Sequence, residues 1–182
     1  MSARFIGIVL LAVASTASAG DQVRSLHTPL AGKSCVPHVD DAISGANSLA
    51  CSGVAGYKLQ VIEDDERFSI NVQSPDKNVH ELDYWNIVTR AFSKLGAKAE
   101  WRVRTVAGKR VPVALIVRVI PAGQSASETR RAPPLLAVAQ IRAQTVCVVA
   151  TLDAANLTAA SRARAIADGY ARPCLGTVRN TS

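Results

Sequence analysis

A strand and a helix that lie between two cysteines near the end of the chain constrain its fold more than any other feature. Residues 145–152 are apolar and rich in β-branched side chains, which predicts a strand, and they include Cys147. Residues 154 to about 171 are rich in alanine and predict a helix that ends shortly before Cys174. One helical face is expected to carry Ala155, Ala159, Ala163, Ile166 and Tyr170. We therefore expect this helix to pack closely on a sheet.

The first 19 residues have the pattern of a secretory signal peptide. Arg4 precedes an apolar run over residues 5–14, and small residues at 17–19 form a cleavage site. The apolar run is shorter than the roughly 20 residues that a transmembrane helix needs, so we predict no membrane span after cleavage. An N-terminal anchor or a buried helix is the alternative. Together with the alanine- and arginine-rich composition, the signal predicts a bacterial protein that is periplasmic or secreted.

The chain has four cysteines, and an even number in an exported protein favours disulfides. We predict the pairs Cys35–Cys51 and Cys147–Cys174, because each closes a short loop and would contribute about 3 kcal/mol. The alternative is a zinc site that uses Cys35 and His38, with Cys51 as a further ligand. Thiolate ligands would have to survive an oxidising compartment, so we expect neither a metal nor a cofactor.

The rest of the sequence predicts one domain. Residues 20–34 show no hydrophobic period and are expected to form a flexible leader, residues 35–176 the domain, and residues 177–182 a disordered tail. Alternating apolar and polar residues at 57–62 and 68–72, on either side of an acidic turn, predict a hairpin.

Further strands are expected at residues 97–104, 111–120 and 135–142, with a mobile loop at 121–134 that is rich in proline and serine. A helix is expected over residues 84–95, because its apolar side chains share one arc, with Asp83 as its N-cap and Gly96 just past its end. These elements predict an α+β fold. It would have a single antiparallel sheet of six to seven strands, two helices packed on one face, and two disulfides.

Three stretches carry a resemblance to a protein family. They are CSGVAGY at residues 51–57, LGAKAEWR at residues 95–102, and the Val-Cys strand with the alanine-rich helix that leads to Cys174. In this combination the chain resembles a group of small exported proteins of unknown function from α-proteobacteria. The resemblance covers most of the mature chain and implies export. Because that group has no assigned activity, it implies no functional residue.

Charge is distributed unevenly along the chain. Residues 20–97 contain 7 basic and 10 acidic side chains, whereas residues 98–182 contain 13 basic and 4 acidic ones. Such an asymmetry predicts a molecule with two electrostatic faces, and its basic half is the place to look for an anion-binding surface.

Arginines on the predicted strands provide the candidate binding site. Those expected to point outward from the sheet are Arg102, Arg104, Arg118 and Arg142. In register, their guanidinium groups form a cationic face that can hold carboxylate, phosphate or sulfate through paired hydrogen bonds. The alternative is cross-strand pairing with Glu100 and ordinary solvation.

We predict from these features a non-enzymatic module that binds an anionic envelope component or a protein. The chain has no G-x-S-x-G, S-x-x-K, P-loop or G-x-G-x-x-G motif. Nucleic acid is not expected as a partner, because the few aromatic side chains are needed for the core. One alternative is an inhibitor of a secreted hydrolase that uses the loop at residues 35–51. The other is a hydrolase of unrecognised type with His38 or His80 as its base.

Overall fold

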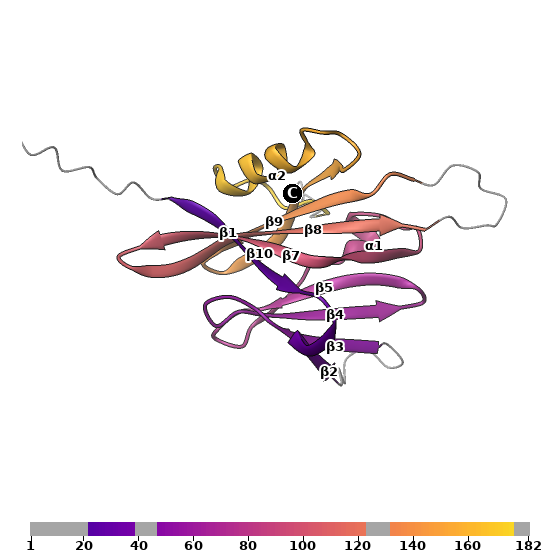
Figure 1. Cartoon of the computed structure of the whole chain (residues 1–182), viewed down its shortest axis with the longest axis horizontal. Helices are drawn as coiled ribbons and strands as arrows, with labels where there is room; N and C mark the ends of the chain where they lie inside the picture. The colour runs from indigo at the N-terminus through magenta and orange to yellow at the C-terminus, as the bar shows by residue number, and fades with distance from the viewer. Residues whose placement is uncertain (1–21, 39–46, 123–131, 177–182) are drawn as a thin grey trace, which may run out of the picture.

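Two antiparallel sheets of five strands each form most of the protein, seen in a computed structural model that describes residues 22–38, 47–122 and 132–176 (Figure 1). The strand order is β1-β7-β8-β9-β10 in sheet A and β2-β3-β4-β5-β6 in sheet B. The predicted signal peptide, the predicted tail and most of the predicted loop at 121–134 lie outside the described residues.

Sheet A consists of β1 (Val23–Pro29), β7 (Ser93–Val106), β8 (Lys109–Pro121), β9 (Leu135–Arg142) and β10 (Thr145–Asp153). Sheet B consists of β2 (Cys35–His38), β3 (Asn47–Ser52), β4 (Lys58–Asp64), β5 (Arg67–Gln73) and β6 (Val79–Glu81). The helical elements are η1 (Gly32–Ser34), α1 (Tyr84–Ile87) and α2 (Ala159–Asp168). Among these described strands, β1 alone pairs out of sequence order.

The two sheets pack face to face around a shared apolar core, because alternate residues of each strand point to the same side. Sheet A contributes Trp101, Val103, Leu115 and Val117, and sheet B contributes Leu59, Val61, Ile70 and Val72. Trp101 is the largest of the fully buried side chains. Its indole N–H donates to the hydroxyl of Thr28 over 2.9 Å, so the buried donor is satisfied and β1 is tied to β7 inside the core.

Helix α2 covers the outer face of sheet A and gives the molecule a third layer (Figure 1). Its buried face consists of Ala159, Ala163 and Ala167, which pack on Ala114, Ile116, Leu136 and Val138 of the sheet. The small side chains allow the close approach that the sequence predicts. The helix is shorter than expected, and Tyr170, which follows its end, is 97% exposed rather than packed.

The prediction of a single sheet with both helices on one face is wrong. Ten described strands form two sheets, and the helices are short. Helix α2 packs on sheet A, whereas the single turn of α1 contacts β5 of sheet B. Alternation along a strand shows that one face is buried but not what covers it, and here a second sheet covers the face that we assigned to helices.

Two local predictions are also wrong. The expected helix at 84–95 is one turn, Tyr84–Ile87, and the chain is already in β7 at Ser93. The expected leader contains β1, whose seven residues pair with β7 from Val23–Arg104 to Pro29–Lys98. Pairing with a strand distant in the sequence overrides weak local preferences at residues 23–29, and pairing with β8 does so at residues 93–95.

Other predictions are confirmed. The hairpin of β4 and β5 closes at Asp64 and Arg67, and β8, β9 and β10 lie where the apolar runs predict them. Both predicted disulfides are present, Cys35–Cys51 and Cys147–Cys174. Cys35 and Cys51 face each other across β2 and β3, which form an antiparallel pair.

Replacing Cys147 and Cys174 together by serine should lower the free energy of unfolding by about 3.5 kcal/mol, because their disulfide closes a loop of 27 residues. Urea unfolding of the non-reduced proteins measures the difference. The matched pair of variants at Cys35 and Cys51, with a separation of 16 residues, should lose about 3 kcal/mol. A loss below about 1 kcal/mol for the first variant would contradict this assignment.

Candidate functional site

Arg102 of β7 lies on the outer face of sheet A and is held by the end of α2. Its Nε and Nη2 atoms donate to the two carboxylate oxygens of Asp168 over 2.8 and 2.6 Å, which makes a bidentate pair. Its Nη1 atom donates to the hydroxyl of Ser25 on β1. Arg102 is 8% exposed. Its guanidinium group is thus occupied by internal partners and fixes where the helix ends on the sheet.

Glu100, two residues earlier on β7, makes a second ion pair with the same helix. Its carboxylate accepts hydrogen bonds from Arg164 over 2.6 and 3.1 Å and from the hydroxyl of Ser25. Partial burial raises the pKa of Glu100, but the hydrogen bonds from Arg164 and Ser25 and the positive charges of Arg164 and Arg102 outweigh it, so the net pKa is lowered. The two pairs, one helical turn apart on α2, set its direction across the sheet.

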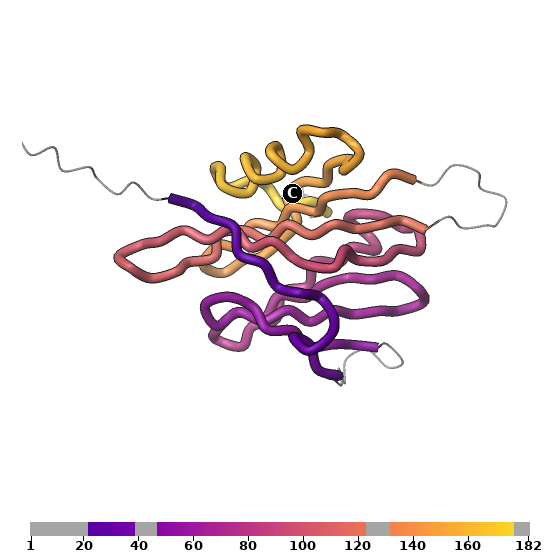
Figure 2. The backbone as a smooth tube through the Cα atoms, in the orientation of Figure 1, coloured from indigo at the N-terminus to yellow at the C-terminus, as the bar shows by residue number. Residues whose placement is uncertain are grey.

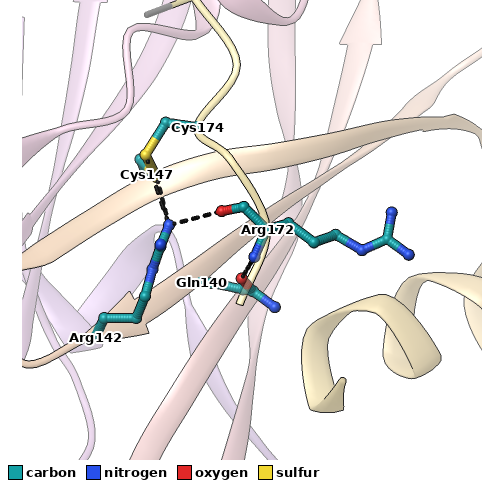
Figure 3. The surroundings of a disulfide bond; sticks show 5 residues. All are labelled: Gln140, Arg142, Cys147, Arg172 and Cys174. Carbon is teal, nitrogen blue, oxygen red and sulfur yellow. Dashed lines mark hydrogen bonds between the residues drawn. A yellow bond between two sulfur atoms is a disulfide. The ribbon is translucent and has the colours of Figure 1, made fainter. Parts of the chain in front are cut away.

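Gln140 of β9 forms hydrogen bonds to the backbone where α2 ends and the segment before Cys174 begins. Its amide nitrogen donates to the carbonyl of Ile166 over 3.2 Å and to that of Tyr170 over 2.9 Å. Its amide oxygen accepts from the backbone N–H of Arg172 over 2.9 Å (Figure 3). These bonds satisfy carbonyls that the helix leaves without internal partners.

Arg142 lies beside the Cys147–Cys174 disulfide (Figure 3). Its Nη2 atom donates to the carbonyl of Arg172 over 3.0 Å and lies 3.2 Å from the sulfur of Cys147. One edge of this guanidinium group therefore holds the segment after α2. Its Nε atom is buried and has no hydrogen-bond partner among the described residues.

Arg104 and Arg142 line the same cavity of about 150 Å³, between sheet A and the end of α2. Gln140, Asp168 and Gly169 form further parts of its wall. Within the described part of the chain, the Nε atom of Arg104 is also buried without a hydrogen-bond partner. Two arginine side chains thus line one small cavity, and the carboxylate in its wall is already paired with Arg102.

The structure therefore separates the four predicted arginines. Arg102, Arg104 and Arg142 gather where α2 ends, whereas Arg118 is exposed and lines a different cavity, together with His27 and Lys98. A ligand-binding role for any of them stays a prediction.

The sequence reading missed Asp168, Arg164 and Gln140. One signal was available for Asp168, since an acidic residue at the C-terminal end of a helix is unfavourable unless a positive charge compensates it. Arg164 and Gln140 carry no such signal, because each finds its partner on an element distant in the sequence.

The structure gives little support to the zinc site and the hydrolase, which were alternatives drawn from the sequence. The Cys35–Cys51 disulfide takes up both thiols that the zinc alternative requires. Among the described residues, no three side chains of His, Cys, Asp or Glu come together in a way that would hold a metal ion. His38 lies beside Gln60, and neither His38 nor His80 lines the cavity at Arg104. The inhibitor alternative concerns a loop whose residues 39–46 lie outside those described.

Searches against family models, curated proteins and solved structures found no match for this chain. Within the described ranges, none of the helices has the length and apolar character needed to cross a membrane.

Replacing Glu100 by glutamine should lower the free energy of unfolding by about 1–3 kcal/mol at pH 7, because Arg164 on α2 loses a charged, partly buried acceptor. The pKa of Glu100 is lowered in the folded protein, so its contribution is present above the unfolded pKa of about 4.3 and is lost as the pH falls through the folded value. Urea unfolding at neutral and at acid pH should therefore give a smaller acid loss for this variant than for the wild type.

The matched control is Asp65→Asn at the β4–β5 turn, where the side chain is 71% exposed. It should change the free energy of unfolding by less than about 0.5 kcal/mol. Equal acid sensitivity of wild type and Glu100→Gln would contradict the assignment.

Proposed function

We propose that this chain is an exported, non-enzymatic binding module, and that it takes up an anionic group between Arg104 and Arg142. The observation that carries the proposal is that Arg104 and Arg142 line one cavity, and that the buried Nε atom of each lacks a hydrogen-bond partner among the described residues. Guanidinium groups donate charge-assisted hydrogen bonds to oxyanions, so an anion in this cavity would accept from both side chains.

The size of the cavity limits what it can hold. Its volume of about 150 Å³ is below the roughly 300–1,000 Å³ of pockets for drug-sized ligands. It therefore suits a single phosphate, sulfate or carboxylate group rather than a whole ligand. Planar guanidinium groups present paired donors that match such oxyanions, which favours arginine over lysine in this role.

The wall of the cavity is compatible with an anion because its acidic member is already neutralised. Asp168 is engaged by both donors of the Arg102 fork, so its charge does not oppose the ligand in full. The exposed Tyr170 follows directly after this wall and offers a ring surface to the rest of a larger molecule.

Two disulfides support an oxidising compartment for the protein. We place it in the periplasm of a bacterium, where its partner would be an anionic component of the cell envelope or a protein with an exposed acidic group. The predicted signal peptide and the arginine-rich second half of the sequence support this placement.

The variant Arg104→Gln should bind inorganic phosphate roughly 10–100-fold more weakly than the wild type, because a charge-assisted hydrogen bond contributes about 1.5–3 kcal/mol. Titration followed by NMR chemical shifts of the residues around the cavity measures the affinity, with acetate as a second probe. Arg104 is the residue to change because Arg142 also holds the segment before Cys174, and its loss would mix binding with stability.

The matched control is Arg90→Gln, which removes the same charge from an exposed residue that does not line the cavity. It should leave phosphate binding within about twofold of the wild type, since exposed charges are screened. Equal weakening in both variants would show a general charge effect and contradict the site. Failure of the wild-type protein to shift at this cavity would also contradict it.

A further inference from the structure

β1 pairs with only part of β7, so the remaining part of β7 forms the edge of sheet A. β1 pairs with β7 as far as Pro29 and Lys98, and the next contact is the N–H of Leu30 with the carbonyl of Ala97 over 3.0 Å. Beyond this point the chain crosses to sheet B through η1, as the indigo tube in Figure 2 shows. Residues 94–96 of β7 therefore form the edge of sheet A between this bond and the bond from the N–H of Ser93 to the carbonyl of Glu66, which is also 3.0 Å long.

An apolar cavity of about 220 Å³ lies between the two sheets beside this edge. Its walls come from both sheets and from the crossing segment, namely Leu30, Val61, Phe68 and Leu95. Lys94, an exposed residue, is the charged member of its lining. The cavity thus offers apolar walls inside the sandwich and a positive charge at its rim.

A second cavity, of about 250 Å³, lies on the outer side of the same edge and shares Gly96 and Ala97 with the first. Lys98, Arg118 and His27 line it and are exposed. Glu100 lines it as well, but its carboxylate is engaged by Arg164 and Ser25. The charges left for a ligand are therefore positive.

A bulge of three residues in β7 lies between the two cavities. Leu95 pairs with Val119 and Ala99 with Val117, so three residues of β7, 96–98, stand opposite Arg118 alone. A Cβ atom on Gly96 would come within 3.0 Å of the Cβ of Arg118, so glycine allows the bulged backbone to pass this close. Bulges of this kind are found where a strand redirects side chains toward a site.

We propose that this edge binds an amphiphile with one acyl chain and an anionic head group. The tail lies between the sheets against Phe68 and Leu95, and the head group lies outside, held by Lys94, Lys98 and Arg118. Each cavity alone is below the roughly 300 Å³ at which ligand pockets begin, so each would hold only one part of such a molecule. The site is separate from the Arg104 cavity and does not rest on the function proposed there.

The charge pattern selects this ligand over a neutral or purely polar one. Burial of each methylene contributes about 0.8 kcal/mol, so affinity should rise with tail length until the apolar cavity is filled. Charge-assisted hydrogen bonds from lysine and arginine then favour a carboxylate or phosphate head. The outer cavity also has apolar walls, Ile116 and Leu136, so the positive side chains at its exposed residues, rather than its whole lining, are what favour an anionic head. A free phosphate has no tail and gains none of the apolar contribution.

Displacement of a fluorescent fatty acid from the purified mature protein tests the proposal, with laurate, its neutral glycerol ester monolaurin, butyrate and inorganic phosphate as competitors. Laurate should compete at least roughly tenfold better than each of the other three. Lauroyl lysophosphatidic acid should compete as laurate does if the head group is read by charge alone. No displacement by laurate, or equal displacement by butyrate, would overturn the proposal.

Two kinds of variant test the tail site and the head-group site separately. Leu95→Trp fills the apolar cavity, and the double variant Lys94→Glu with Lys98→Glu reverses the rim. Each should weaken laurate binding roughly tenfold or more, equivalent to about 1.4 kcal/mol. Lys109→Glu with Arg110→Glu, at the distant hairpin tip, reverses the same number of charges and should leave laurate binding unchanged. Thermal unfolding confirms that each variant is folded.

Should Leu95→Trp fail to fold, the lysine variants decide, because both side chains are exposed. Laurate affinity that is equal in the wild type and in the double lysine variant would overturn the assignment of the head group. Laurate affinity that falls in Arg104→Gln but not in these variants would place the ligand at the other cavity and overturn this site.

Discussion

Burial of both faces of sheet A is the constraint on which the rest of the structure depends. Its inner face meets sheet B, and its outer face needs a cover because β8 and β9 carry apolar residues there as well. Helix α2 supplies that cover with alanines, and two ion pairs to β7 fix its direction. The arginine cavity exists only because this helix ends above the sheet and the chain after it turns back to the disulfide.

How much of this fold the sequence predicts depends on whether a pattern is local. The β4–β5 hairpin, the strands at 135–142 and 145–153, and both disulfides follow from neighbouring residues, and they are confirmed. The pairing of Leu26 with Trp101 does not, since nothing within residues 23–29 identifies a partner so distant in the chain. The apolar residues at 84–95 fit a helical arc and also a turn followed by a strand, and only pairing with β8 decides between them.

The candidate site shows the same limit. Alternation along β7 correctly puts Arg102 and Arg104 on the face opposite Trp101, because side chains two residues apart share a face. What each arginine does there depends on α2. Asp168 occupies Arg102, and the end of the helix leaves Arg104 beside a cavity. Residues of β7, β8, β9 and α2 meet at this point, and their spacing in the sequence does not predict that they are neighbours.

β1 pairs with a strand that is distant in the sequence, and this affects the order in which the strands assemble. Strands β2–β6 follow one another in sheet B and can pair with their sequence neighbours, and the same holds for β7–β10. β1 precedes all of them in the chain, and its only described partner is β7, so it pairs after a much longer loop has closed. Closure of a loop this long is slow relative to hairpin formation, which makes docking of β1 a late event in folding. Until then Trp101 lacks the hydroxyl of Thr28, and the sandwich stays open along the side that β1 later seals.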